Sequence, residues 1–197
     1  MNRCGFRRTV LALFVVAFVF ALAGETVSAQ KQKYTIRAIA RGTSTQLGKL
    51  INVDIYINSL SAPDEQKALL EAFQSNGSEG LANALDKLPA KGRIALTGTV
   101  GYDINYIRVF NMPDGSRMLR FVTDRPVRFG EVYASTRSQD YKITVGEIVI
   151  PKDLKDQKKM KGTLLPAVWV KLDKKGELEM ESYQFPWELT NMKVYNK

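Results

Sequence analysis

The sequence predicts a mainly β (α+β) fold, an antiparallel β barrel or sandwich of about nine strands with one two-helix hairpin inserted after the second strand. Three observations lead to this prediction. Short segments alternate apolar and polar side chains, which is the period of a half-buried strand. Turn residues separate these segments at short, even spacing. Only one connection between strands has helical periodicity, which disfavours a parallel βαβ arrangement.

Residues 1–29 are predicted to be a cleavable export signal. Arginines precede an uninterrupted apolar run from Val10 to Ala23, and small residues ending at Ala29 supply a cleavage site before Gln30. The run is too short for the roughly 20 residues that span a bilayer. The sequence therefore predicts a periplasmic or secreted protein that is not membrane-spanning after cleavage, with residues 30–197 forming a single mostly β domain.

The first two strands are predicted at Tyr34–Ala40 and Ile51–Asn58. The second alternates strictly, with isoleucine and valine on one face and Asn52, Asp54 and other polar residues on the opposite face. The segment between the strands is rich in Gly, Ser and Thr and is predicted to be a loop.

A helical hairpin is predicted at about 62–88, where the apolar period changes from two to between three and four. Ser61 opens a capping-box pattern for the first helix, which is expected to stop at Gly77. Ser78 is expected to cap the second helix and Pro89 to end it. We interpret this hairpin as cover for an open end or face of the sheet.

The rest of the chain is predicted to be extended. The clearest hairpin signal is Pro113-Asp114-Gly115, and a change of phase near Tyr106 indicates a bulge or turn near Asp103. The expected strands are Ile94–Tyr102, Ile104–Phe110, Arg117–Thr123, Phe129–Ala134, Tyr141–Ile150, Leu164–Leu172, Leu178–Tyr183 and a short strand after Trp187.

Composition excludes many catalytic mechanisms. The chain has no histidine, and its one cysteine, Cys4, lies within the predicted signal. Without these side chains there is no Ser-His-Asp triad, cysteine nucleophile, conventional zinc site or redox dithiol. An exported domain without disulfides is typical of bacteria. We therefore expect no catalytic residues, no metal and no cofactor.

Three kinds of chemistry survive this exclusion: a carboxylate pair as in glycosidases, a Ser-Lys dyad and an oxygen-ligand Ca²⁺ site. A glycan hydrolase requires only a pair of carboxyl groups. The candidates are Asp103, Glu131 and Glu147, each in an otherwise apolar or aromatic strand.

Arginine and lysine are segregated along the chain. Residues 93–137 contain seven arginines and no lysine, whereas every cation after Tyr141 is a lysine. Arginine's planar fork suits recognition of carboxylate or phosphate and stacks on aromatic rings. The alternative is that these arginines balance nearby acids on solvated strand faces. The candidate ligand-binding residues are Arg108, Arg117, Arg120, Arg128, Tyr106 and Phe121.

A second basic feature is the segment Lys152–Lys161, which contains five lysines. It is interpreted as a loop between strands, either a contact for an anionic membrane or polysaccharide or a solvated, mobile connection.

The leading hypothesis is an exported bacterial non-catalytic binding or envelope-interaction domain that recognises an anionic or glycan ligand. The expected partners are an anionic small molecule, a glycan or an envelope surface, and not nucleic acid. The alternative is a structural or adhesive envelope protein without a small ligand, and the third is the carboxylate-dependent glycan hydrolase. In size and strand number the chain is similar to lipocalin-like barrels, but their Gly-x-Trp signature is missing after Gln30. That similarity concerns architecture and implies no activity.

Overall fold

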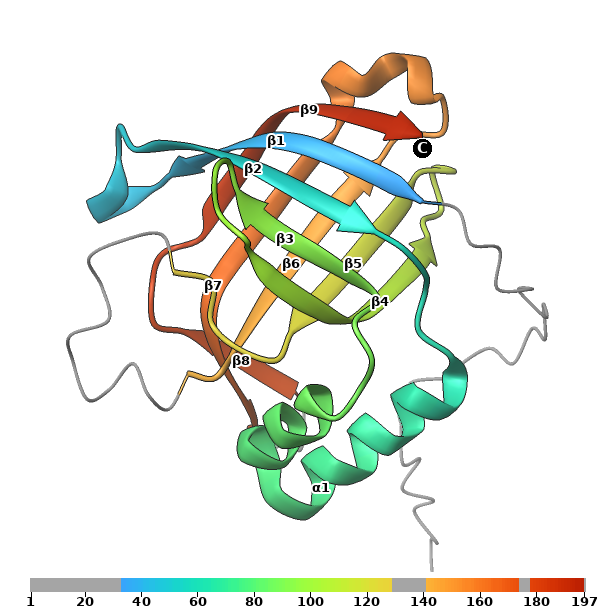
Figure 1. Cartoon of the computed structure of the whole chain (residues 1–197), viewed down its shortest axis with the longest axis vertical. Coiled ribbons are helices and arrows are strands. Elements are labelled where there is room, and N and C mark those ends of the chain that lie inside the picture. The colour runs from blue at the N-terminus through green and yellow to red at the C-terminus, as the bar shows by residue number, and fades with distance from the viewer. Residues whose placement is uncertain (1–32, 129–140, 174–177, 197) are drawn as a thin grey trace, which may run out of the picture.

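The computed structural model describes residues 33–128, 141–173 and 178–196, which form a closed eight-stranded antiparallel barrel with one additional strand and one α-helix after the second strand (Figure 1). The predicted fold class is confirmed, and of the two predicted architectures the structure is the barrel. The strands are β1 (Tyr34–Gly42), β2 (Leu50–Ile57), β3 (Gly92–Leu96), β4 (Tyr102–Asn111), β5 (Arg117–Thr123), β6 (Ile143–Ile150), β7 (Lys161–Leu172), β8 (Leu178–Ser182) and β9 (Trp187–Asn196). The helices are α1 (Pro63–Asp86) and the short 3₁₀ segments η1 (Ser44–Gln46) and η3 (Leu154–Lys159).

The strands from β1 to β8 pair in chain order, each antiparallel to the next, and β9 closes the ring between β1 and β7. One edge of β7 is shared by two strands. Its residues 162–164 pair with β9, and its residues 168–172 pair with β8. The hairpin of β7 and β8 therefore continues past the closed ring as the additional strand.

Two predicted strands differ most from the structure. The expected strand Ile94–Tyr102 is interrupted, because Gly98 and Gly101 adopt φ of +87° and +81° and turn the chain between β3 and β4. The predicted phase change is confirmed as a register shift between Ile104 and Tyr106. The final strand, expected to be short, is the ten-residue β9. The expected strand Phe129–Ala134 lies outside the described residues.

The predicted helical hairpin is present as α1, whose helical geometry is broken at Asn76 and Gly77. The stop predicted at Gly77 is confirmed, whereas the N-cap roles predicted for Ser61 and Ser78 were wrong. Ser61 Oγ accepts a hydrogen bond from Ile107 N of β4, and the Glu65 carboxylate accepts one from Ala62 N at the helix start. The hydroxyl of buried Ser78 likewise accepts a hydrogen bond from the barrel, from Val170 N of β7. Both serines therefore dock α1 on strands.

The barrel interior is filled with apolar side chains. Trp187, Phe121 and several isoleucines and leucines are almost completely buried there. A small residue accommodates one of these rings: Gly146 on β6 lies beneath the ring of Phe121.

A second apolar cluster lies on the outer face of the barrel, under α1. Leu69, Phe73 and Leu85 of the helix pack with Val145 of β6 and Val168 of β7. The predicted role of the helical segment as cover for a face of the sheet is thus what the structure has: α1 covers outward-facing residues near one end of β6 and β7 (Figure 1).

Candidate functional site

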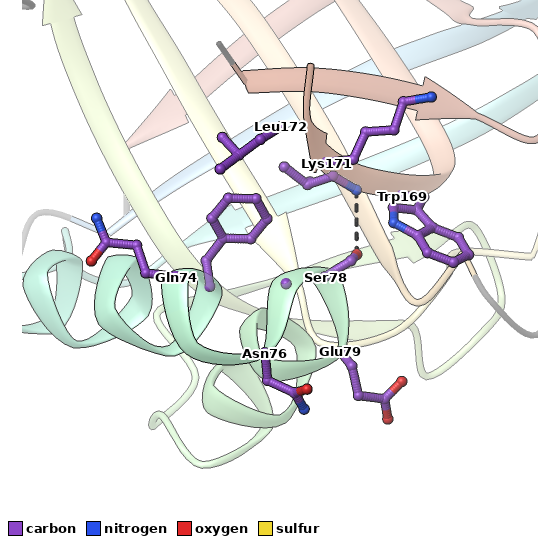
Figure 2. A pocket seen from close by; sticks show the side chains of 10 residues that line it. Gln74, Asn76, Ser78, Glu79, Trp169, Lys171 and Leu172 are labelled. Carbon is purple, nitrogen blue, oxygen red and sulfur yellow. Dashed lines mark hydrogen bonds between the residues drawn. The ribbon is translucent and has the colours of Figure 1, made fainter. Parts of the chain in front are cut away.

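The two best-formed pockets both lie outside the filled interior. The larger is a half-open pocket of about 490 Å³ between the kink of α1 and β7 (Figure 2). Its centre is apolar, with Phe73 and Leu172 among the lining residues. In Figure 2 the amide of Asn76 and the carboxylate of Glu79 point away from β7. The polar groups at this pocket therefore do not converge on a common point.

The one lining ammonium of this pocket is already paired. Lys171 Nζ lies 3.2 Å from Glu181 and 3.6 Å from Glu179 of β8. The hydrogen bond to Glu181 and the charge of Glu179 raise the pKa of Lys171 above its ordinary value. Glu79 is bonded to Lys142 at 2.5 Å. The pocket consequently offers mainly apolar contact to a small ligand.

Two of the predicted arginines converge on the outer face of the barrel. Arg108 on β4 lies directly opposite Arg120 on β5, and each guanidinium carbon is 5.2 Å from the ring centroid of Phe110. Two like charges opposite one another are destabilising unless acceptors surround them. Arg120 is paired with Glu147 at 2.6 Å, and Arg108 donates to the side-chain oxygen of Gln66.

The other four candidate residues lie elsewhere. Phe121 is inside the barrel, on the opposite face of β5 from Arg120, and is fully buried. Tyr106 packs in the cluster under α1, and exposed Arg117 begins β5 at the hairpin with β4. Arg128 follows β5, and its backbone N donates to Tyr102 Oη at 3.2 Å. The six residues proposed from the sequence do not form one site.

A second groove, of about 420 Å³, crosses the outer face of β1, β2 and β9. It lies where β1 and β9 shift register between Arg37 and Ile39, and Asn191 adopts a φ of 49° in this region. The polar residues that line it are Arg37, Asn52, Asp54, Thr97, Asn191, Lys193 and Tyr195. We call these seven residues the β1–β2–β9 groove.

The groove combines charged, amide and aromatic groups. Arg37 lies 3.3 Å from Asp54, and its guanidinium carbon is 5.3 Å from the ring centroid of Tyr195. Tyr195 is 43% exposed. Within the described parts of the chain, the exposed side chains of Asn52 and Lys193 form no hydrogen bond or ion pair. A ligand in this groove would meet a carboxylate, a guanidinium, amides, an ammonium and a tyrosine ring together.

The sequence held one signal for this groove. Alternation placed Asn52 and Asp54 on the polar face of β2, as the structure has them. Their partners come from β1 and from β9 at the other end of the chain, and no local pattern links those strands.

The carboxylates proposed for a glycan hydrolase are held in ion pairs. Asp103 lies 2.9 Å from Arg93, and Glu147 pairs with Arg120. Glu131 lies outside the described residues. Within residues 33–128, 141–173 and 178–196, no three Asp, Glu, His or Cys side chains are grouped as metal ligands.

No protein-family model matches the chain, and no curated protein or solved structure is similar to it at a significant level. In the portion of the chain that the structure describes, no helix has both the length and the apolar character needed to cross a membrane.

Proposed function

We propose that the protein is an exported bacterial, non-catalytic binding domain that recognises a glycan in the β1–β2–β9 groove. The observation that carries this proposal is the convergence of Tyr195 with planar polar side chains from three strands. Binding sites combine an apolar or aromatic surface with a few polar groups that fix orientation. Export is expected from the signal predicted at residues 1–29.

The donor and acceptor inventory of the groove suits neighbouring sugar hydroxyls. Asp54 supplies acceptors only, Arg37 donors only, and Asn52 both. A hydroxyl both donates and accepts, so adjacent hydroxyls can satisfy an amide and a charged group together. The exposed Tyr195 ring adds a flat surface for the C–H face of a sugar.

The charge of the groove favours an acidic sugar. Arg37 and Lys193 outweigh Asp54, and residues 30–197 contain 26 basic against 19 acidic side chains, a formal charge of +7. A positive field raises the rate at which an anionic ligand arrives. A uronic acid or phosphorylated sugar therefore fits the groove better than a neutral one.

A binding role is preferred to hydrolysis. Acid–base hydrolysis of a glycoside requires two carboxyl groups at the bond that breaks, and Asp54 is the single carboxylate among the groove's lining residues. The filled interior favours a second candidate, a structural or adhesive envelope protein without a small ligand.

Calorimetric titration with acidic and neutral oligosaccharides tests the proposal. We expect an acidic oligosaccharide to bind, and Tyr195→Ala to weaken it about tenfold, which corresponds to about 1.4 kcal/mol. Asn52→Ala should weaken it as well. Phe185→Ala is the matched control, because Phe185 is 51% exposed and precedes the start of β9, away from the groove. Unchanged affinity in both groove variants, or no binding of any glycan, would contradict the proposal.

A further inference from the structure

A strongly basic surface lies at the barrel end where β4 joins β5 and β6 joins β7. We call it the basic pole and define it as Arg117, Lys152, Lys155, Lys158 and Lys161, all of them exposed. In Figure 1 the connection between β6 and β7 lies at the top of the molecule and α1 at the bottom. The basic pole and α1 therefore lie at opposite ends of the molecule.

The connection that carries most of these lysines is folded onto the barrel. Its last residue, Met160, is buried to 4% exposure and belongs to the interior core. Gln157 Oε1 accepts a hydrogen bond from Val194 N of β9 at 3.2 Å, and the Asp153 side chain accepts one from Lys155 N at 2.9 Å. Lys155 and Lys158 therefore project from an anchored 3₁₀ segment.

The acidic groups nearby are already occupied. Asp156 pairs with Lys159 at 2.7 Å. Asp114 accepts hydrogen bonds from both the side chain and the backbone of Ser116, and these bonds lower its pKa below the ordinary value of 3.8. By contrast, none of the five cations of the basic pole has an ion-pair partner among the described residues. The pole thus presents a net positive charge to solvent.

Apolar side chains lie beside these cations. Leu154 is 41% exposed within the lysine-rich connection, and Met112 is 37% exposed on the hairpin between β4 and β5. The two elements touch, because Gly115 of that hairpin lies against the side chain of Lys152. Cations surrounding exposed apolar groups are the pattern of surfaces that bind anionic bilayers, where the cations meet headgroups and the apolar groups enter the interface.

We propose that the basic pole docks the protein peripherally on an anionic phospholipid bilayer, with the cations on the headgroups and Leu154 in the interfacial layer. In this orientation the end of the barrel that carries η3 would contact the membrane. It would leave the β1–β2–β9 groove on the barrel's side wall. This inference does not depend on what the groove binds.

Vesicle co-sedimentation of the full chain tests this proposal. We expect partition onto phosphatidylglycerol–phosphatidylcholine vesicles, none onto pure phosphatidylcholine, and a decrease as salt is raised. Each lysine removed should lower the partition coefficient about fivefold, so Lys155→Gln with Lys158→Gln should lower it about 25-fold. Leu154→Ser should lower it further without a change in charge.

The control is Lys67→Gln with Lys87→Gln, which removes the same charge from α1 and its C-terminal cap. It should bind like the unchanged protein, as should Tyr195→Ala, and both double-lysine variants should melt normally because the replaced lysines are exposed.

Equal losses in the two double-lysine variants would overturn the proposal, because net charge alone would then account for binding. Absence of partition onto phosphatidylglycerol vesicles would overturn it too. Binding of an acidic polysaccharide that depends on Lys155 and Lys158 but not on Leu154, without vesicle binding, would assign the basic pole to a polysaccharide instead.

Discussion

Gly146 on β6 shows how tightly single residues are specified inside the barrel. A methyl group at this position would overlap the ring of Phe121 on the neighbouring strand. Protein interiors are packed as densely as organic crystals, so the ring has no free volume to move into. The absence of a side chain at residue 146 is therefore what allows Phe121 to lie within the closed barrel.

We expect Gly146→Ala to lower the free energy of unfolding by about 1–3 kcal/mol or more, because overpacking forces strands or rotamers to shift. Denaturant titration followed by tryptophan fluorescence measures this change. Adding Phe121→Leu to Gly146→Ala should recover part of the loss, since the smaller side chain makes room for the new methyl. An unchanged midpoint for Gly146→Ala would mean that the interior is not packed as described.

For single residues, the sequence predicted the face of the strand on which a side chain lies better than it predicted which side chains lie close together. Alternation along each strand indicates which residues share a face, and Arg108 and Arg120 do share the outer face. The same rule puts Phe121 on the opposite face from Arg120, but grouping by residue type placed both in one site. Proximity across strands depends on register, which the local sequence did not define.

The kink of α1 is the clearest case at the scale of one element. Gly77 adopts φ of +56° and ψ of −145°, a backbone region that is essentially restricted to glycine. The kink lets Phe73 before it and Leu85 after it both reach the outer face of the barrel. The sequence predicted the interruption at Gly77 because glycine so often ends helices.

We expect Gly77→Ala to destabilise the protein by about 1–3 kcal/mol, the usual cost of holding a side chain in a sparsely populated backbone region. Ser75→Ala is the control: Ser75 is exposed and lies just before the kink, and among the described residues its hydroxyl bonds only the Glu71 carbonyl of its own helix. Thermal melts of both variants check the difference. A Gly77→Ala protein as stable as Ser75→Ala would show that the kink does not constrain the backbone.

Element boundaries were harder to predict than element types. Ser61 and Ser78 have the composition of helix caps, yet both hydroxyls accept backbone N–H groups from strands. A serine hydroxyl oxygen can accept a backbone N–H group either from the start of a helix or from a neighbouring strand. Tertiary packing decides which of the two donors it meets. The length of β9 was underestimated for a similar reason, since it follows from pairing with β1.

At the scale of the whole molecule, the number and antiparallel order of strands were predictable, and closure was not. A sandwich and a barrel share the same alternation and turns. They differ in which distant strands pair, here β1 with β9 and β6 with β7. The groove depends on the first of these pairings. The β1–β2–β9 groove, which forms only when β9 pairs with β1, therefore could not be predicted from local sequence patterns.

The proposed export has a measurable consequence for the whole chain. We expect the intact mass of protein recovered from the periplasm of a bacterial host to correspond to a chain that begins at Gln30. That chain contains no cysteine, so its melting curve should be identical with and without reductant. A main species that retains Met1 would contradict cleavage.

The pairing of β1 with β9 also constrains the order of assembly. Tyr34 at the start of β1 lies opposite Asn196 at the end of β9, so the first strand of the barrel acquires its second neighbour only when the last strand arrives. A ribosome delivers the chain from the N-terminus, and unpaired strand edges are templates for aggregation. The edge of β1 that pairs with β9 therefore stays unpaired until the C-terminal strand is available, and loss of β9 alone would leave β1 and the first part of β7 open to pairing between molecules.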